Sequence, residues 1–248
     1  MSKFLNLILV VAALLPASAT LRETDKPPAN RRNFVACPIV RDTKTMPCWL
    51  AEYEGEIYYL GQQGSSGAEF YPPQLNHEVL VEGTVTSERR VCGGIPLSPV
   101  RVSVLREINR ACNTLLPAEE GAEPPPPPPY PARAPLPDTT REFKIPFDFD
   151  SDYLTLHTTR IVGEAARVAK LVNAAKIEVK GYRATTWLSN GQKIIEAESI
   201  AEMRAKKVGE ILSGLGLKTV SVSWKNEPDP CDGVTDSTNR RVTISLKP

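Results

Sequence analysis

The stretch Phe147–Arg241 decides the fold of this chain, and it opens with the residues FDFDS at 147–151. It continues through MRAKKV at 203–208 and closes with NRRV at 239–242. Apolar side chains two residues apart run through the first segment, which predicts a strand with one apolar face. The second segment lies within an apolar pattern of helical period, and the third runs into another alternating pattern.

The pattern between these segments changes type in a regular order. Two helices are predicted, with apolar faces that include Ile161, Ala165, Val168, Ala169 and Val172 in the first and Ile200, Met203, Val208, Ile211, Leu212 and Leu215 in the second. Four strands are predicted, with alternating apolar residues Phe143, Ile145, Phe147 and Phe149; Ile177 and Val179; Val220, Val222 and Trp224; and Val242, Ile244 and Leu246. The order β-α-β-α-β-β predicts an α+β domain with helices on one face of a mixed sheet and right-handed crossovers.

The three segments, in this order and on these element types, resemble an OmpA-like peptidoglycan-binding domain over residues 142–248. The resemblance implies binding of the diaminopimelate residue of peptidoglycan stem peptides. It assigns a carboxylate-binding guanidinium to Arg204, at the start of the second helix, and a second to Arg241 in NRRV. Asn239 in the same motif and Asp150 at the end of the first strand complete the implied peptidoglycan-binding residues, and Arg240 also matches the motif.

The chain departs from the family pattern in one important turn. The family has an aspartate in a G-x-T-D turn after the second strand, whereas residues 181–184 read GYRA, so Ala184 stands at that position. Loss of a carboxylate facing an ammonium would weaken binding about ten- to a hundredfold. Glu196 and Glu198, in a connection longer than usual, are candidates to replace it. The alternative role of the two implied arginines is a salt bridge or a cap within the fold, and that of Asp150 is a turn cap.

The first half of the chain points to an exported protein. Residues 1–19 resemble a secretory signal, with Lys3, an apolar run from Phe4 to Leu15, and cleavage after Ala19. The apolar run is short for a membrane span, which makes a retained anchor the weaker alternative. No later stretch is apolar enough to cross a membrane. We therefore expect a periplasmic protein, associated with the cell envelope or outer membrane.

Five cysteines agree with an oxidising compartment. Four of them lie in the first half, and three pairings are open; proximity in the sequence favours Cys37 with Cys48 and Cys92 with Cys112. Cys231 is left over, either as a free thiol or as a link to the first half or to a second chain. No C-x-x-C motif is present, and the cysteines lack companion histidines for zinc, so no metal or other cofactor is predicted.

Residues 34–117 predict a small β-rich domain, after a polar lead-in. Residues 48–60 indicate a hairpin that turns at Glu54-Gly55, and Gly83 marks a bulge in a strand at 79–85. A further strand is expected at 100–104, and apolar residues at helical spacing over 105–115 predict a short helix. Tyrosines such as Tyr58 fill a core or, alternatively, form a contact surface. We expect this domain to bind an envelope protein that the sequence does not identify.

Residues 118–140 predict a linker, because an unbroken proline run at 124–129 cannot enter a sheet or helix interior. A polyproline helix of about 3.1 Å per residue would make a stiff spacer of roughly 40 Å that holds the two domains apart. The alternative is a docking ligand for a module with an aromatic groove.

Charge and motif content exclude several function classes. Thirty basic against 29 acidic residues give a formal charge of +1, which argues against nucleic-acid binding. Neither His77 nor His157 has a triad or metal-ligand neighbourhood, and no phosphate-binding glycine loop is present, so an enzyme is not expected. Two hypotheses remain: a non-catalytic tether to the diaminopimelate stem, or a degenerate OmpA-like module that acts as a structural subunit or adaptor in an envelope assembly.

Overall fold

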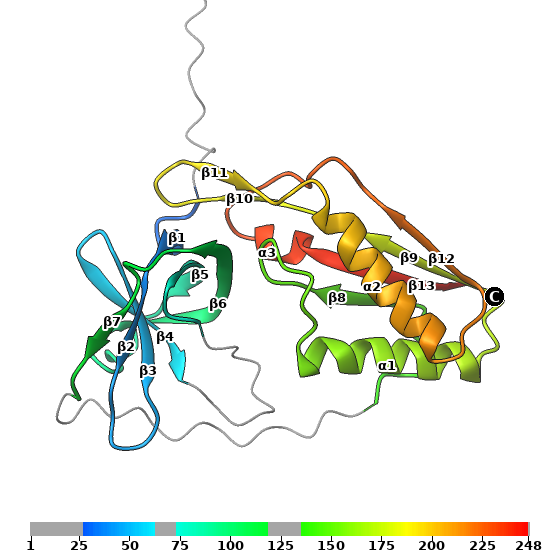
Figure 1. Ribbon diagram of the computed structural model, residues 1–248, viewed down its shortest axis with the longest axis horizontal. Coiled ribbons are helices and arrows are strands. Elements are labelled where there is room, and N and C mark those ends of the chain that lie inside the picture. The colour runs from blue at the N-terminus through cyan, green and yellow to red at the C-terminus, as the bar shows by residue number, and fades with distance from the viewer. Residues whose placement is uncertain (1–26, 63–72, 119–134, 248) are drawn as a thin grey trace, which may run out of the picture.

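The computed structural model describes residues 27–62, 73–118 and 135–247 of the chain. The predicted signal sequence and the proline run lie outside these residues. The described chain forms two domains that lie end to end along the longest axis of the molecule (Figure 1). The N-terminal domain is built from strands, and the C-terminal domain has helices packed on a sheet, so the predicted α+β class is confirmed.

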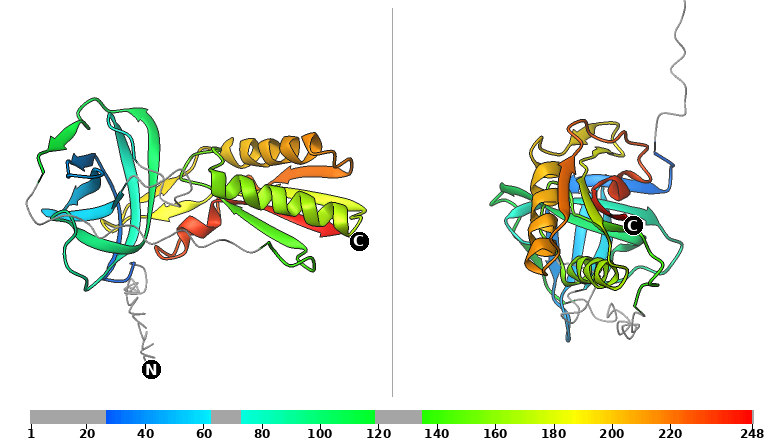
Figure 2. Two further views of the ribbon diagram at one scale, coloured as in Figure 1. Left: turned by 90° about the horizontal axis from the view of Figure 1, so that it is seen from below. Right: turned by 90° about the vertical axis from the view of Figure 1, so that its right-hand side faces the viewer.

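The N-terminal domain is one curled sheet of seven strands in the order β1-β5-β6-β4-β3-β2-β7 (Figure 2). The strands are β1 (Arg31–Ala36), β2 (Pro38–Arg41), β3 (Cys48–Tyr53), β4 (Glu56–Gln62), β5 (His77–Val85), β6 (Ile95–Ile108) and β7 (Thr114–Leu116). Residues from five of these strands share a core, formed by Phe34, Trp49, Ala51, Tyr58, Leu60, Val79, Val81, Leu97 and Val102.

The predicted hairpin turn and the predicted bulge in this domain are both confirmed. The β3–β4 hairpin turns at Glu54 and Gly55, which both have positive φ, at 53° and 78°, as a tight hairpin turn requires. The pairing of β5 with β6 shifts register between Gly83 and Val85, as expected for a bulge. A Cβ on Gly83 would lie only 2.8 Å from the Cβ of Leu97, so no larger residue fits there without movement.

The disulfide pairing and one helix were predicted wrongly. The disulfides join Cys37 to Cys112 and Cys48 to Cys92. Sequence proximity failed because β2 and β7 run side by side, and their pairing brings the segments just before them, at 37 and 112, together. Residues 105–115 form the end of β6, a turn and β7 in place of a helix. Two of the apolar residues with helical spacing there, Ile108 and Leu115, are 70% and 67% exposed, so they cover no core.

The C-terminal domain has a four-stranded sheet in the order β12-β9-β13-β8, with β9 parallel to β12 and β13 antiparallel to β8 and β9. Its elements are β8 (Glu142–Pro146), α1 (Leu156–Leu171), β9 (Lys176–Gly181), β10 (Thr185–Trp187), β11 (Lys193–Ile195), α2 (Ile200–Gly214), β12 (Val220–Trp224), α3 (Asp236–Asn239) and β13 (Arg241–Lys247). The predicted strands and helices are present, with a hairpin β10–β11 and the short α3 added.

Alternation along the strands builds the core of the C-terminal domain. On β8, for example, Phe143 and Ile145 are buried, whereas Glu142 and Lys144 are exposed. The apolar face of the sheet packs against α1 and α2 in one cluster. Thr155 caps α1, its Oγ1 accepting from the backbone N–H of Thr158 at 3.2 Å. Gly181 ends β9 where the backbone meets the start of α2; a Cβ there would lie 2.0 Å from the carbonyl oxygen of Ala201, so glycine is required.

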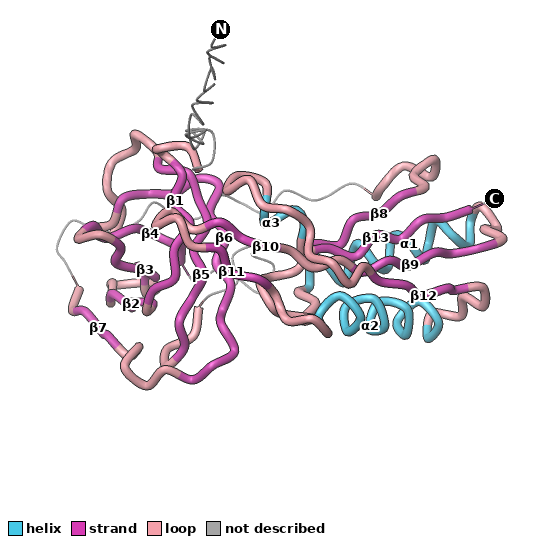
Figure 3. Tube along the Cα trace, turned by 90° about the horizontal axis from the view of Figure 1, so that it is seen from above, coloured by secondary structure: helices cyan, strands magenta, loops and turns pink. Residues whose placement is uncertain are grey.

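The two domains contact each other directly, so the expectation that a stiff spacer holds them apart is wrong. The β10–β11 hairpin and α3 lie between the domains (Figure 3). Leu80 of the N-terminal domain packs with Phe149 and Leu188 of the C-terminal domain in one buried cluster. Burial of this apolar surface, together with the polar contacts described below, stabilises the docked arrangement.

Candidate functional site

Arg204, one of the two arginines that the resemblance assigns to the ligand, is fully buried in the first turns of α2. Its guanidinium forms a bidentate ion pair with Glu196, with Nη2–Oε1 and Nη1–Oε2 distances of 2.5 and 3.1 Å. Both side chains have no exposed surface. The positive charge of Arg204 is therefore neutralised within the domain.

Three further hydrogen bonds complete the surroundings of Arg204. Nε donates to the carbonyl of Ser151 at 2.7 Å, Nη2 to that of Asp148 at 2.8 Å, and Nη1 to that of Tyr182 at 3.1 Å. With the two bonds to Glu196, all five N–H donors of this guanidinium are used. Arg204 has no donor left for the carboxylate of a ligand.

Glu196, a candidate to replace the missing aspartate, does reach that turn, but its carboxylate binds groups of this domain. The β10–β11 hairpin returns it to the turn after β9, where its Oε2 accepts from the backbone N–H of Ala184 at 2.8 Å. Its Oε1 accepts from the backbone N–H of Asp150 at 2.7 Å. Glu198, the other candidate, is exposed and belongs to no such network.

Asp150 also acts within the fold. It has a positive φ of 51°, and its Oδ1 accepts from the backbone N–H of Ala197 at 2.9 Å. Its carbonyl oxygen accepts from Nε of Arg106, in the N-terminal domain, at 2.8 Å. Asp150 therefore closes a turn, as the alternative interpretation of the sequence proposed, and contacts the other domain.

Arg241 is the sequence-predicted site residue that keeps unused donors. Its Nη1 donates to Asp229 at 3.0 Å and to the carbonyl of Asn239 at 3.2 Å, and its guanidinium stacks 4.1 Å above the ring centroid of Tyr182. Within the described part of the chain, Nε and Nη2 of Arg241 donate no hydrogen bond. Its side chain is 22% exposed. Asn239 is engaged through Nδ2 with the carbonyl of Pro230 at 3.1 Å.

The structure thus brings Arg204 and Arg241 to the same end of the domain, since both contact Tyr182. Arg204 lies inside and is saturated, whereas Arg241 lies near the surface. Of these two arginines, Arg241 is the one that keeps donors for an external anion among the described contacts.

Arg240 is the residue whose role the sequence did not reveal. Its side chain is fully buried and forms an ion pair with Glu82 of β5 in the N-terminal domain, with an Nη1–Oε1 distance of 3.3 Å. Nη1 also donates to Oγ1 of Thr186 at 3.0 Å. Burial disfavours the charged form, but the carboxylate of Glu82 outweighs it and raises the pKa of Arg240. This pair joins the two domains.

Polar contacts surround the pair between the domains. Nδ2 of Asn33, which is completely buried, donates to the carbonyls of Trp187 and Gly233 at 2.9 and 2.7 Å. The backbone N–H of Phe149 donates to Oγ of Ser103 at 2.9 Å. The N-terminal domain therefore covers the end of the C-terminal domain at which the predicted binding residues lie.

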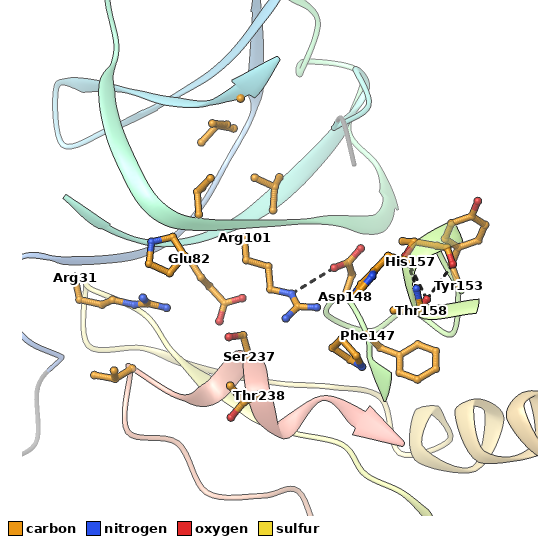
Figure 4. A pocket seen from close by; sticks show the side chains of 18 of the residues that line it. Arg31, Glu82, Arg101, Phe147, Asp148, Tyr153, His157, Thr158, Ser237 and Thr238 are labelled. Atoms are coloured by element: carbon orange, nitrogen blue, oxygen red, sulfur yellow. Dashed lines mark hydrogen bonds and ion pairs between the residues drawn. The ribbon is translucent and has the colours of Figure 1, made fainter. Parts of the chain in front are cut away.

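A cavity of about 690 Å³ lies beside this contact, lined by residues of both domains (Figure 4). Arg31, Glu82 and Arg101 reach it from the N-terminal domain, and Asp148 and His157 from the C-terminal domain. The residues that the structure describes contain no group of three His, Cys, Asp or Glu side chains that could hold a metal ion. Among the helices in the described ranges, none is long and apolar enough to span a membrane.

Comparison with known proteins finds similarity in solved structures. The OmpA-like domain of FopA1 from Francisella tularensis is 20% identical, with 42% of this chain and 70% of that chain covered and a TM-score of 0.34. A putative MotB-like protein from Desulfovibrio vulgaris is 15% identical, with coverages of 43% and 74% and a TM-score of 0.34. An outer membrane protein from Borrelia burgdorferi is 19% identical, with coverages of 43% and 87% and a TM-score of 0.30.

The structural neighbours are thus OmpA-like and MotB-like proteins, matched over part of the chain, which is the resemblance predicted from residues 142–248. No protein-family model matches the chain. No curated protein matches it either.

Proposed function

We propose that this chain is a non-catalytic cell-envelope protein in which the OmpA-like domain serves as a structural or adaptor module. The observation that carries the proposal is the buried pair of Arg204 and Glu196, which uses every donor of the arginine. An anionic ligand could reach Arg204 only after Glu196 had left it, and separating a buried ion pair is strongly unfavourable. The two disulfides support a location in an oxidising compartment such as the periplasm.

The docked N-terminal domain supports the same proposal. Because it buries Glu82, Asn33 and Leu80 against the C-terminal domain, the two domains present one combined surface to a partner. A rigid two-domain unit suits a subunit of an assembly. The partner that we propose is an envelope protein bound by this unit.

Attachment to the diaminopimelate stem of peptidoglycan is the second candidate function, and Arg241 is the observation that favours it. Its Nε and Nη2 are available among the described contacts, and Asp229 beside it supplies a carboxylate. In this version a single guanidinium, together with Asp229, would bind the ligand end, with Arg204, Asp150 and Asn239 supporting the loops around it.

Retention of the full chain on purified sacculi separates the two candidates. The adaptor proposal predicts no retention above a control protein, together with a stable protein partner recovered by cross-linking in cells. The tethering candidate predicts retention that falls about tenfold in Arg241→Gln, through loss of a charge-assisted hydrogen bond. Arg160→Gln, on the exposed face of α1, is the matched control. Retention that depends on Arg241 would overturn the adaptor proposal.

A further inference from the structure

The cavity between the domains has the size and lining of a small-molecule site. Its volume of about 690 Å³ falls in the range of about 300–1,000 Å³ typical of ligand pockets. Residues of β6 form one side, and the start of α1 and the short α3 form the other. Neither Arg204 nor Arg241 lines it, so it is separate from the residues to which the resemblance assigns the ligand.

Arg101 of β6 is the main reason to expect a ligand in this cavity. Its Nε is buried and has no hydrogen-bond partner among the residues that the structure describes. Its closest ionic neighbour is Asp148, with an Nε–Oδ1 distance of 3.5 Å, which is longer than a good hydrogen bond. Burial lowers the pKa of Arg101. Since buried donors in proteins are normally satisfied, this guanidinium lacks the acceptor that an anion would supply.

Arg31 of β1 adds a second guanidinium to the same cavity. Its Nε donates to Oδ1 of Asn33 at 2.9 Å and its Nη1 lies 3.4 Å from Oγ1 of Thr84, which leaves Nη2 without a hydrogen bond among the described contacts. The side chains of Arg31 and Arg101 both extend into the space beside Glu82 (Figure 4). Burial also lowers the pKa of Arg31.

The charged side chains around the cavity leave guanidinium donors unused. Arg31 and Arg101 line it with Glu82 and Asp148, and Glu82 is already held by Arg240, while Asp232 and Asp236 also lie near Arg31. In partly buried surroundings the unused donors of the two arginines can form strong charge-assisted hydrogen bonds with an anion. Ser237 and Thr238 line the opposite side; the hydroxyl of Ser237 can donate to an anion, whereas that of Thr238 already donates to the carbonyl of Thr235 at 2.7 Å.

The apolar part of the lining comes from both domains: Leu60, Pro99, Val100, Val102, Phe147 and Val234. A ligand that fills the cavity therefore needs a short apolar part besides its charged group.

We propose that this interdomain cavity binds a small organic anion, in which an oxyanion is carried on a short apolar group, and that Arg101 and Arg31 bind the oxyanion. A peptide carboxyl terminus and a phosphate monoester share this chemistry. Because both domains line the cavity, the ligand stabilises their docked arrangement by mass action. The inference does not depend on the proposed function, since an adaptor and a tether could both carry this site.

Calorimetric titration of the full chain tests the proposal with two probes. N-acetyl-alanyl-alanine carries a carboxylate on a small apolar group, and its C-terminal amide is the uncharged control. Inorganic phosphate, compared with chloride at equal ionic strength, tests the phosphate source. At least tenfold tighter binding of the acid than of the amide, or binding of phosphate but not chloride, supports the site. Absence of binding by both anions would overturn it.

Substitutions locate the binding. Arg101→Gln is expected to weaken binding of the active probe about tenfold or more, because it removes a charge-assisted hydrogen bond. Arg31→Gln is expected to weaken it as well, and it decides the question if Arg101→Gln does not fold. Arg90→Gln, an exposed arginine of the same domain paired with Glu56, should bind as the unaltered protein does. Equal affinity in the folded cavity variants and the unaltered chain contradicts the assignment.

Discussion

Two fully buried ion pairs lie at the same end of the C-terminal domain, and they connect different parts of the molecule. Arg204 and Glu196 are eight residues apart and join α2 to a loop of their own domain. Arg240 and Glu82 are 158 residues apart and join one domain to the other. Both pairs join an arginine to a glutamate, but the first uses an arginine to which the resemblance assigns the ligand, whereas the second joins the N-terminal domain to the surface around it.

The two pairs also differ in how completely they are satisfied. Every N–H of Arg204 has an acceptor, whereas Nε of Arg240 is buried without one. A buried guanidinium whose N–H donors are all used within one domain is part of the fold of that domain. An unsaturated pair at an interface can regain water when the domains separate, so its loss should cost less.

Removal of Glu196 should have the largest effect. Glu196→Ala leaves the guanidinium of Arg204 buried without its counter-charge, and we expect the C-terminal domain to lose about 3–5 kcal/mol of unfolding free energy. Denaturant unfolding followed by the far-UV circular dichroism of α1 and α2 measures this. Glu198→Ala, at an exposed position of the same loop, should change stability by less than about 0.5 kcal/mol. Similar losses of unfolding free energy in the two variants would show that the buried ion pair does not account for the effect of Glu196→Ala.

Removal of Glu82 should separate the domains with a smaller loss of stability. In Glu82→Ala, undocking returns Arg240 to water, so we expect a cost of about 1–3 kcal/mol and a more extended molecule. Small-angle scattering and limited proteolysis detect the change in shape. Glu107→Ala, on the exposed end of β6, is the control. A compact Glu82→Ala variant would mean that apolar contacts around Leu80 suffice to hold the domains together.

A partly exposed pair provides the smallest effect. Asp152 lies 2.6 Å from Nζ of Lys207, and although burial opposes ionisation, this contact lowers the pKa of Asp152. Because the folded pKa lies below the unfolded one, the pair stabilises the fold above the ordinary pKa of 3.8 and stops doing so as the pH falls through the folded pKa.

Asp152→Asn should therefore reduce unfolding free energy by less than about 1 kcal/mol at pH 6 and by a smaller amount near about pH 2. Denaturant unfolding at the two pH values checks this. A loss that persists undiminished in acid would point to a contact other than the ion pair with Lys207.

Local periodicity was sufficient to predict most of the C-terminal domain. Strands β8, β9 and β13 and helices α1 and α2 each have one apolar side that faces a single core, so the apolar pattern around residues such as Phe143 and Val208 predicted both the element and which side of it is buried. The N-terminal domain was harder, because its strands pair across long sequence distances and because Ile108 and Leu115, within the apolar pattern at 105–115, are exposed. The disulfides follow that strand pairing, which the spacing of Cys37, Cys48, Cys92 and Cys112 does not encode.

The site could be predicted in position but not in role. The sequence identified Arg204, Arg241 and the missing aspartate at Ala184, and it named Glu196 as one of two substitutes. It could not show that the β10–β11 hairpin would return Glu196 to the buried side of Arg204. Nothing local indicated a partner for Arg240, since Glu82 lies in a strand of another domain. The run Val79-Leu80-Val81 was a signal available in the sequence: Val79 and Val81 fill one face of β5, so the apolar Leu80 between them lies on the other face, where it packs against the C-terminal domain.

The long sequence distance between Glu82 and Arg240 sets an order of events during synthesis. The ribosome completes β5 well before Arg240 exists, because 158 residues separate the two. The N-terminal domain can fold in that interval only with the carboxylate of Glu82 still hydrated. Docking is therefore among the last steps of maturation, and a chain interrupted before Arg240 would display the surface that the complete protein conceals.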